Sequence, residues 1–270
     1  IGDYRSDPEL LSNVLNLKND VNFRQGLWRA HQENKKRLAG FLYRWKVKED
    51  VLTICWARRI AAYKRPSLIF QDVERLKSMA NRIGPIQILY AGKAHPNDSL
   101  AFTYVNDIMN TIDKTDGAED FLKIVMLENY DTAIANTLVS SVDIWLNNPL
   151  PPYEASGTSG MKAISNGVLQ LSTLDGWVLE AADKPIGKFF GWKDDGRSYS
   201  DGLVLRLEED SNALYNALEE MMIYYYGMTK KDAFDIHSPW IDMMIECISQ
   251  FAFFNTHRMV RQYKELVWNF

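Results

Sequence analysis

The feature that most constrains this chain is a series of short apolar runs separated by segments with helical periodicity. The runs are rich in Val, Ile and Leu and nearly continuous, which is typical of strands covered on both faces of a sheet. They occupy residues 51–57, 86–91, 121–127, 142–146 and 168–172. Strand and helix in alternation predict right-handed βαβ units, and therefore an α/β fold with a parallel sheet.

Amphipathic helices are expected at both ends of this core. Apolar positions between residues 22 and 45 recur near helical spacing, while Lys35, Lys36 and Arg37 fall largely on the opposite, solvated face. Two further amphipathic helices are expected at residues 212–226 and 240–263.

Residues 183–203 contain four glycines and several charges, and we expect a loop there. No composition shift separates two domains, so the chain reads as one domain in three parts. These are amino-terminal helices at 1–50, a core at 51–205 and carboxyl-terminal helices at 206–270.

Composition excludes some classes of function. A net charge of −4 and a pI near 5.7 argue against a nucleic-acid-binding surface. No apolar stretch is long enough to cross a membrane, and the four histidines lack metal-binding spacing. Cys55 and Cys247 are expected to be buried free thiols, which suits a reducing cytoplasm.

Residues 154–162 read Glu-Ala-Ser-Gly-Thr-Ser-Gly-Met-Lys. Ser156, Thr158 and Ser159 are residue types that begin helices, so backbone N–H groups should converge near the glycines and favour phosphate. Lys162 would act there as a point charge, or as an amine that forms a Schiff base with an aldehyde cofactor. The spacing fits neither the P-loop nor the dinucleotide pattern, and an ordinary capped helix with a solvated lysine is the alternative.

Four positive charges follow the first apolar run, within residues 58–65. The carboxyl ends of parallel strands are where ligands of α/β sheets bind, so this cluster is well placed for a phosphate. We expect Arg59 and Lys64 to bind it. For Arg65 we expect a solvated helix face.

Four motifs, in this order and spacing, resemble those of the α-glucan phosphorylases, the family that includes the glycogen, starch and maltodextrin enzymes. They are Arg-Ile-Ala-Ala-Tyr-Lys-Arg at 59–65, Gly-Lys-Ala-His-Pro at 92–96, Leu-Glu-Asn-Tyr at 127–130 and the turn at 154–162. Trp-Leu-Asn-Asn-Pro at 145–149 resembles the short prokaryotic branch. The resemblance implies the carboxyl-terminal, Rossmann-like domain of a GT-B glycosyltransferase fold, in which two such domains face a cleft.

The resemblance also implies pyridoxal 5'-phosphate as the cofactor. Lys162 matches the family's Schiff-base lysine. Groups that match contacts of the cofactor phosphate or ring are Arg58, Thr158, Ser159 and Tyr130.

On the substrate side, the resemblance assigns three catalytic positions. Arg59 and Lys64 match groups that hold orthophosphate or the phosphate of glucose 1-phosphate, and Glu154 matches a group that binds glucose hydroxyls. The backbone of the next three residues matches the same glucose site: Ala155, Ser156 and Gly157.

The implied reaction is phosphorolysis of an α-1,4-glucan to glucose 1-phosphate with retained configuration. A phosphate monoester has a second pKa of about 6, so the cofactor phosphate could pass a proton to the substrate phosphate near neutral pH. The implied partners are the glucan, orthophosphate, glucose 1-phosphate and an amino-terminal domain that closes the cleft. The sequence leaves open whether the chain also forms a homo-oligomer.

Two other functions remain open at this point. A GT-B glycosyltransferase that uses a nucleotide sugar also places Arg, Lys and Glu around a diphosphate, but it has no use for the Lys162 amine. A non-catalytic glucan-binding or interaction module is the other. A test for the cofactor separates the first alternative from a phosphorylase.

Overall fold

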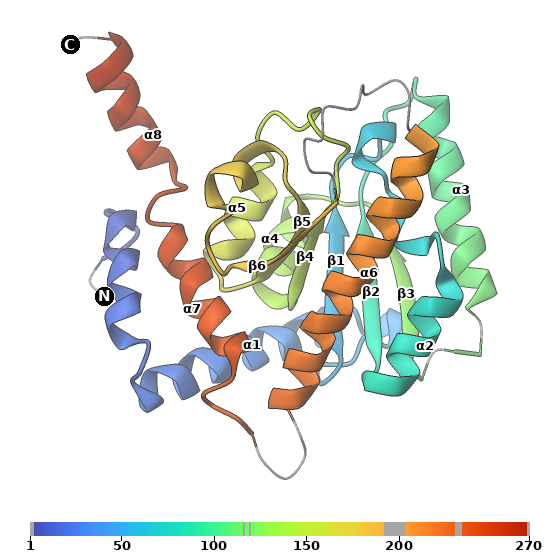
Figure 1. Cartoon of the computed structure of the whole chain (residues 1–270), viewed down its shortest axis with the longest axis horizontal. Coiled ribbons are helices and arrows are strands. Elements are labelled where there is room, and N and C mark those ends of the chain that lie inside the picture. The colour runs from blue at the N-terminus through green and yellow to red at the C-terminus, as the bar shows by residue number, and fades with distance from the viewer. Residues whose placement is uncertain (1–2, 116, 119, 192–202, 230–233, 269–270) are drawn as a thin grey trace.

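The computed structural model describes residues 3–115, 117–118, 120–191, 203–229 and 234–268, and the side chains of all of these except residues 203–206. Its centre is a parallel sheet with strand order β3-β2-β1-β4-β5-β6 (Figure 1). The strands are β1 (Leu52–Ala57), β2 (Ile86–Ala91), β3 (Leu122–Leu127), β4 (Ile144–Asn147), β5 (Leu169–Thr173) and β6 (Gly187–Phe190). The expected α/β, Rossmann-like fold is confirmed.

Helices cover both faces of the sheet. One face packs against α2 (Val73–Ile83), α3 (Ser99–Lys114) and α6 (Leu203–Met228). The other face packs against α1 (Val21–Phe41) and α4 (Thr132–Ser141), with the short α5 (Thr158–Ile164) beside α4. This double cover explains why the strand sequences are apolar at nearly every position.

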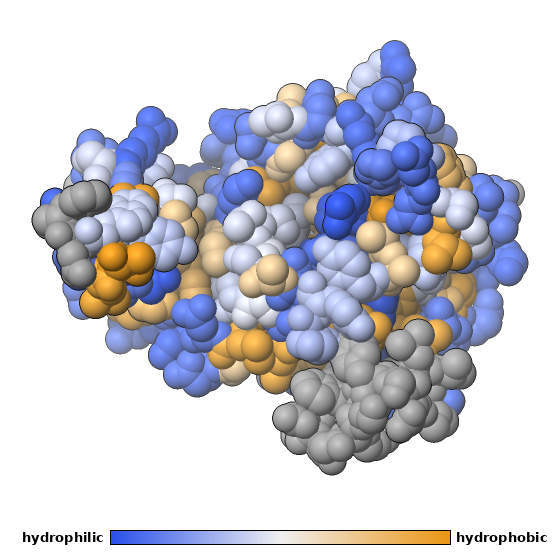
Figure 2. All heavy atoms as spheres, turned by 90° about the horizontal axis from the view of Figure 1, so that it is seen from above, coloured by the Kyte–Doolittle hydropathy of each residue, from blue (hydrophilic) through white to orange (hydrophobic). Residues whose placement is uncertain are grey.

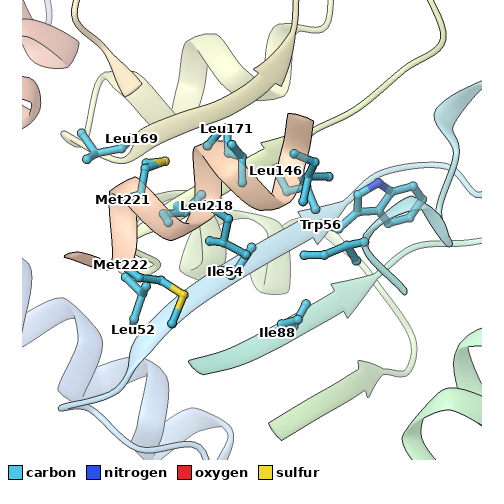
Figure 3. Packing of buried hydrophobic residues seen from close by; sticks show 14 of the residues in the cluster. Leu52, Ile54, Trp56, Ile88, Leu146, Leu169, Leu171, Leu218, Met221 and Met222 are labelled. Atoms are coloured by element: carbon cyan, nitrogen blue, oxygen red, sulfur yellow. The ribbon is translucent and has the colours of Figure 1, made fainter. Parts of the chain in front are cut away.

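Side chains along β1 show how the sheet serves two cores. Leu52, Ile54 and Trp56 point towards α6, where they meet methionine and leucine side chains (Figure 3). Cys55 and Ala57, on the alternate positions, belong to the opposite cluster. Burial raises the pKa of the Cys55 thiol, as it does for Cys247, so both cysteines are buried free thiols with little tendency to ionise.

The expectation that Lys35 is solvated is wrong. Its side chain is 1% exposed, and its ammonium donates to Asp143 Oδ2 at 2.6 Å, Val51 O at 2.9 Å and the Tyr225 hydroxyl at 2.8 Å. His31 Nε2 lies 2.8 Å from the second carboxylate oxygen of Asp143. We call Lys35, Asp143, His31 and Tyr225 the basal charge cluster, because it lies at the amino-terminal end of the sheet and joins α1, β4 and α6.

Two expectations about secondary structure are also wrong. The loop expected at 183–203 contains β6, the edge strand, although residues 192–202 of that segment lie outside the described residues. The helix expected at 240–263 is two helices, α7 (Pro239–Gln250) and α8 (Thr256–Tyr263), because the side chain of Asn255 accepts from Arg258 N and begins a new helix.

The remaining elements are short. The first helix expected near the amino terminus is a 3-10 helix, η1 (Pro8–Leu17), packed on α7. Other 3-10 turns are η2 (Tyr43–Trp45), η3 (Ala62–Lys64), η4 (Leu68–Phe70) and η5 (Gly176–Ala181), and a π-helical turn, η6 (Lys264–Trp268), follows α8. The division of the chain at residues 50 and 205 stays a prediction.

Candidate functional site

The carboxyl edge of the sheet is where the strand order reverses, since β1 lies between β2 and β4. Ligands of open α/β sheets bind outside the strand ends at such a point. The loop after β1 and the loop after β4 meet there, and Leu150 N donates to Tyr63 O at 2.7 Å. Figure 2 looks down onto this edge and shows a mostly hydrophilic surface with small apolar patches.

Lys64 and Glu154, one from each loop, form an ion pair in which both side chains are mostly buried. The Lys64 ammonium also lies 4.7 Å from the centroid of the Tyr63 ring. The position of Glu154 is fixed further because its backbone N–H donates to Asp175 Oδ2 at 2.9 Å. The structure therefore brings together two of the three residues expected to be catalytic.

Arg59, the third, lies five residues before Lys64 and is exposed, and its guanidinium makes no hydrogen bond or ion pair within the described part of the protein. Its side chain is available to an anion from outside. Arg58 points the other way: it is buried and donates to Asn147 Oδ1 and to Leu146 O. Burial lowers the pKa of Arg58 to about 10, and among the described residues its Nε has no partner.

The expectation that Arg65 is solvated is also wrong, because its side chain is buried. Its backbone adopts the left-handed conformation (φ 47°) that ends the η3 turn. The guanidinium donates to Asn148 O at 2.9 Å and Pro149 O at 3.0 Å, and it pairs with Asp210 on α6. This arginine belongs to the framework of the site.

The glycine turn has the local structure that its residue types predict, with one difference. Gly157 (φ 86°) is the residue before α5, and no side chain caps the first turn, so neither Ser156 nor Thr158 is the expected helix cap. Ser156 is half-buried and its carbonyl accepts from Trp177 N at 2.9 Å, whereas Ala155 and Thr158 are exposed.

A cavity of about 350 Å³ lies between α4 and α5. Lys162, Ser159 and Tyr130 line it, so the structure brings together three of the five residues expected around the cofactor. Trp145 holds Ser159 in place by donating from Nε1 to its hydroxyl at 3.3 Å. Burial raises the pKa of the Tyr130 phenol, which therefore stays protonated at neutral pH. Arg58 and Thr158 are not among the residues that line this cavity.

The far wall of the cavity comes from residues that the motifs did not indicate. One face of α4 supplies Thr132, Ala135, Asn136 and Val139, and Asp131, which begins α4 by accepting from Ile134 N at 2.9 Å, completes the wall. The signal was present in the sequence: after Tyr130, these positions have the i, i+3, i+4, i+7 spacing of one helix face.

These groups fit a pyridoxal phosphate. The cavity offers an amine, a hydroxyl and an aromatic ring, and the buried Arg58 Nε is a donor without a partner among the described residues. In that same part of the chain no group of three or more His, Cys, Asp or Glu could hold a metal ion, and His95 is a loop residue whose Nδ1 accepts from Asn97 N at 3.2 Å. None of the described helices is long and apolar enough to cross a membrane.

The fold and this edge define a Rossmann-like α/β domain that is built to bind ligands at the carboxyl ends of its strands. The family model for carbohydrate phosphorylases matches residues 1–195. The chain therefore belongs to the carbohydrate phosphorylase family, as the motifs indicated.

Several relatives agree with this assignment. A glycogen phosphorylase of Aquifex aeolicus is 41% identical over 88% of this chain and 36% of its own length, and a maltodextrin phosphorylase of Thermococcus litoralis is 38% identical over 88% of this chain and 29% of its own length. The muscle glycogen phosphorylase of Mus musculus is 31% identical over 67% of this chain. The chain thus spans about a third of the length of the first two relatives.

Proposed function

We propose that this chain is the cofactor- and phosphate-binding domain of a pyridoxal-phosphate-dependent α-glucan phosphorylase. The reaction is transfer of a glucosyl unit from an α-1,4-glucan to orthophosphate, which yields glucose 1-phosphate with retained configuration. The observation that carries the proposal is the cavity lined by Lys162, Ser159 and Tyr130, in a chain that also presents Arg59, Lys64 and Glu154 at the carboxyl edge.

When bound, pyridoxal phosphate supplies a phosphate group whose second pKa, about 6, suits proton transfer to the substrate phosphate near neutral pH. Lys162 would hold the cofactor through its amine, and Ser159 and Tyr130 would orient it. The buried Nε of Arg58 and the hydroxyl of Thr158 are further candidates for contacts with its phosphate.

The residues of the carboxyl edge divide the work on the substrate. The exposed guanidinium of Arg59 grips the incoming phosphate, and its planar fork matches two phosphate oxygens. The ammonium of Lys64 adds a point charge, which offsets repulsion between two neighbouring phosphates. Its ion pair with Glu154 orients that carboxylate towards glucose hydroxyls, with the backbone of residues 155–157 beside it.

Because this chain covers only 36% and 29% of the length of the first two relatives, we propose that a partner domain from the amino-terminal part of the enzyme forms the other wall of the cleft. A cleft enzyme needs both walls to orient its substrate and exclude water. We expect the isolated chain to be nearly inactive, and robust phosphorolysis of maltodextrin by it would contradict this.

The two buried free thiols suit a cytoplasmic location.

The test is covalent labelling. The purified chain is incubated with pyridoxal phosphate, reduced with borohydride, digested and mapped by mass spectrometry. We expect the label at Lys162, its loss in Lys162→Ala, and normal labelling in Lys184→Ala, which alters a half-buried lysine paired with Asp183. A label that persists in Lys162→Ala, or no label in the unaltered chain, would reject the cofactor and favour a nucleotide-sugar transferase or a binding module.

A further inference from the structure

Arg65 joins three parts of the carboxyl edge: its own loop after β1, the loop after β4, and α6. Its three guanidinium nitrogens reach two consecutive carbonyls, Asn148 O and Pro149 O, and the carboxylate of Asp210. The loop after β4 returns a bond, because Asn148 Nδ2 donates to Arg65 O at 2.8 Å. Both side chains of the Arg65–Asp210 ion pair are less than a tenth exposed.

The Arg65–Asp210 ion pair connects the loop that carries Lys64 with the loop that carries Glu154. Lys64 is the chain neighbour of Arg65 and sits in the η3 turn, which Arg65 closes by donating from its backbone N–H to Ala62 O at 2.9 Å. Glu154 is reached through the other loop, whose start at residues 148–149 is bound by the Arg65 side chain. One guanidinium therefore sets the spacing between the two loops that carry Lys64 and Glu154.

Asp210 comes from α6, which lies outside the stretch matched by the family model, residues 1–195. It is packed tightly, since a Cβ on Gly191 would lie 2.8 Å from Asp210 Oδ1. Among the described residues Arg65 is its one cationic partner, and a buried ion pair resists any rearrangement that would leave either charge alone. The position of α6 is thereby transmitted to the two loops.

We propose that Arg65 and Asp210 are positioning residues for the phosphate site: together they hold Lys64 and Glu154 in place and make α6 part of the catalytic framework. The assignment of that site as the phosphate site rests on the function proposed above. The geometry of the two loops is independent of it.

The first measurement is hydrogen exchange of the 270-residue chain, comparing Arg65→Lys and Asp210→Asn with the unaltered chain. We expect amides in residues 60–66 and 148–154, including Leu150, to exchange at least about tenfold faster, while β1 and β3 keep their protection. The matched control is Arg75→Ala, a half-buried arginine that also binds α6, through Asn212 at 2.9 Å and Asn216 at 2.6 Å, but lies away from the edge. Unchanged exchange in both loops, or equal loss throughout the sheet, would overturn the proposal.

The second measurement is calorimetric binding of orthophosphate to the chain loaded with pyridoxal phosphate. Loss of outer partners that orient ligand-binding groups commonly weakens binding by about 10- to 100-fold, and we expect Asp210→Asn to fall in this range with normal cofactor content. Arg65→Lys keeps the charge but not the two hydrogen bonds to carbonyl oxygens. The affinity of this variant for orthophosphate should therefore lie between that of the unaltered chain and that of Asp210→Asn.

The two measurements distinguish the positioning role of Arg65 and Asp210 from the assignment of this edge as the phosphate site. Orthophosphate affinity that stays unchanged in both variants while the loops loosen would show that the ion pair is structural only, against the proposal. An unaltered chain that binds no orthophosphate would reject the proposed function at this edge, while the exchange data would still decide whether Arg65 and Asp210 hold the two loops.

Discussion

The two ends of β1 and β4 both carry lysine and carboxylate side chains, but they use them in opposite ways. In the basal charge cluster, three acceptors bind the Lys35 ammonium, and both oxygens of Asp143 have partners. At the carboxyl edge, Arg59 has no partner among the described residues. Lys64 and Glu154 are paired with each other, and their side chains, 10% and 8% exposed, are slightly more open to solvent than those of the Lys35–Asp143 pair, at 1% and 0%. A cation enclosed by acceptors stabilises the fold, whereas one left open is available to a ligand.

The largest expected effect is at the enclosed end. Asp143→Asn removes the counter-charge of the buried Lys35, and leaving a buried charge unpaired costs about 3–5 kcal/mol of unfolding free energy. Urea unfolding followed by circular dichroism measures it. Asp183→Asn, whose exposed carboxylate pairs with Lys184 at 2.9 Å, is the control and should change stability by less than about 0.5 kcal/mol. Similar losses in the two variants would remove the distinction between enclosed and open charges.

At the open end, activity should fall without loss of stability. In an enzyme completed as proposed above, Arg59→Ala removes a contact that strengthens as charge moves in the transition state, so the rate should fall by about 10²–10³, or roughly 3–4 kcal/mol. Arg59→Lys should also be impaired, because a point charge does not reproduce the planar fork. Steady-state kinetics in both directions measure this, with Arg44→Ala, an exposed arginine beside Tyr43, as the silent control. Loss of cofactor with unchanged phosphate affinity would mean that Arg59 belongs to the cofactor site.

Acid should reduce the contribution of the basal charge cluster to the free energy of unfolding. Burial alone would raise the pKa of the Asp143 carboxyl, but Lys35 and His31 outweigh burial and hold it below its ordinary value of 3.8. A carboxyl with a lowered folded-state pKa stabilises the protein above its unfolded pKa and loses this contribution as pH falls through the folded value. The stability difference between the unaltered chain and Asp143→Asn should therefore be constant near neutral pH and shrink below 3.8. Urea midpoints over that range test it, and a difference that grows on acidification would show the opposite sign.

The smallest expected effects compare two glycines. A Cβ on Gly160, in the first turn of α5, would lie 2.8 Å from Gln170 Oε1 and 2.9 Å from Trp177 Nε1, so Gly160→Ala should cost about 1–3 kcal/mol. Gly26, in α1 near the basal charge cluster, has nothing within 4 Å, and Gly26→Ala should stabilise by about 0.4–1 kcal/mol. Thermal unfolding gives both signs, and a stabilised Gly160→Ala would show that this turn adjusts easily.

The positions of five strands were predictable because a two-sided cover imposes an apolar sequence on each strand, whatever its neighbours are. The edge strand β6 was missed because it is short, starts at Gly187 and is only half-buried along most of its length. The break between α7 and α8 had a local signal in Asn255, which an uninterrupted helical pattern obscured.

The candidate site was predictable where a motif is local, as for Lys162 and Ser159 in one turn of helix. Lys35 and Arg65 were misread for one physical reason. A charged side chain is buried only when a partner compensates it, and those partners, Asp143 and Asp210, lie 108 and 145 residues away in the chain. Pairings of that range depend on the folded topology, which periodicity does not encode.

Trp145 gives this domain an optical reporter of its own. The indole is fully buried on β4, yet its N–H is bonded to Ser159, which lines the cavity that also contains Lys162. A chromophore held in that cavity would quench the emission of this indole by energy transfer. Subtracting the spectrum of Trp145→Phe isolates its share from that of the other tryptophans, of which the chain has eight in all. Occupancy of the cavity then becomes visible in an unlabelled sample, in real time.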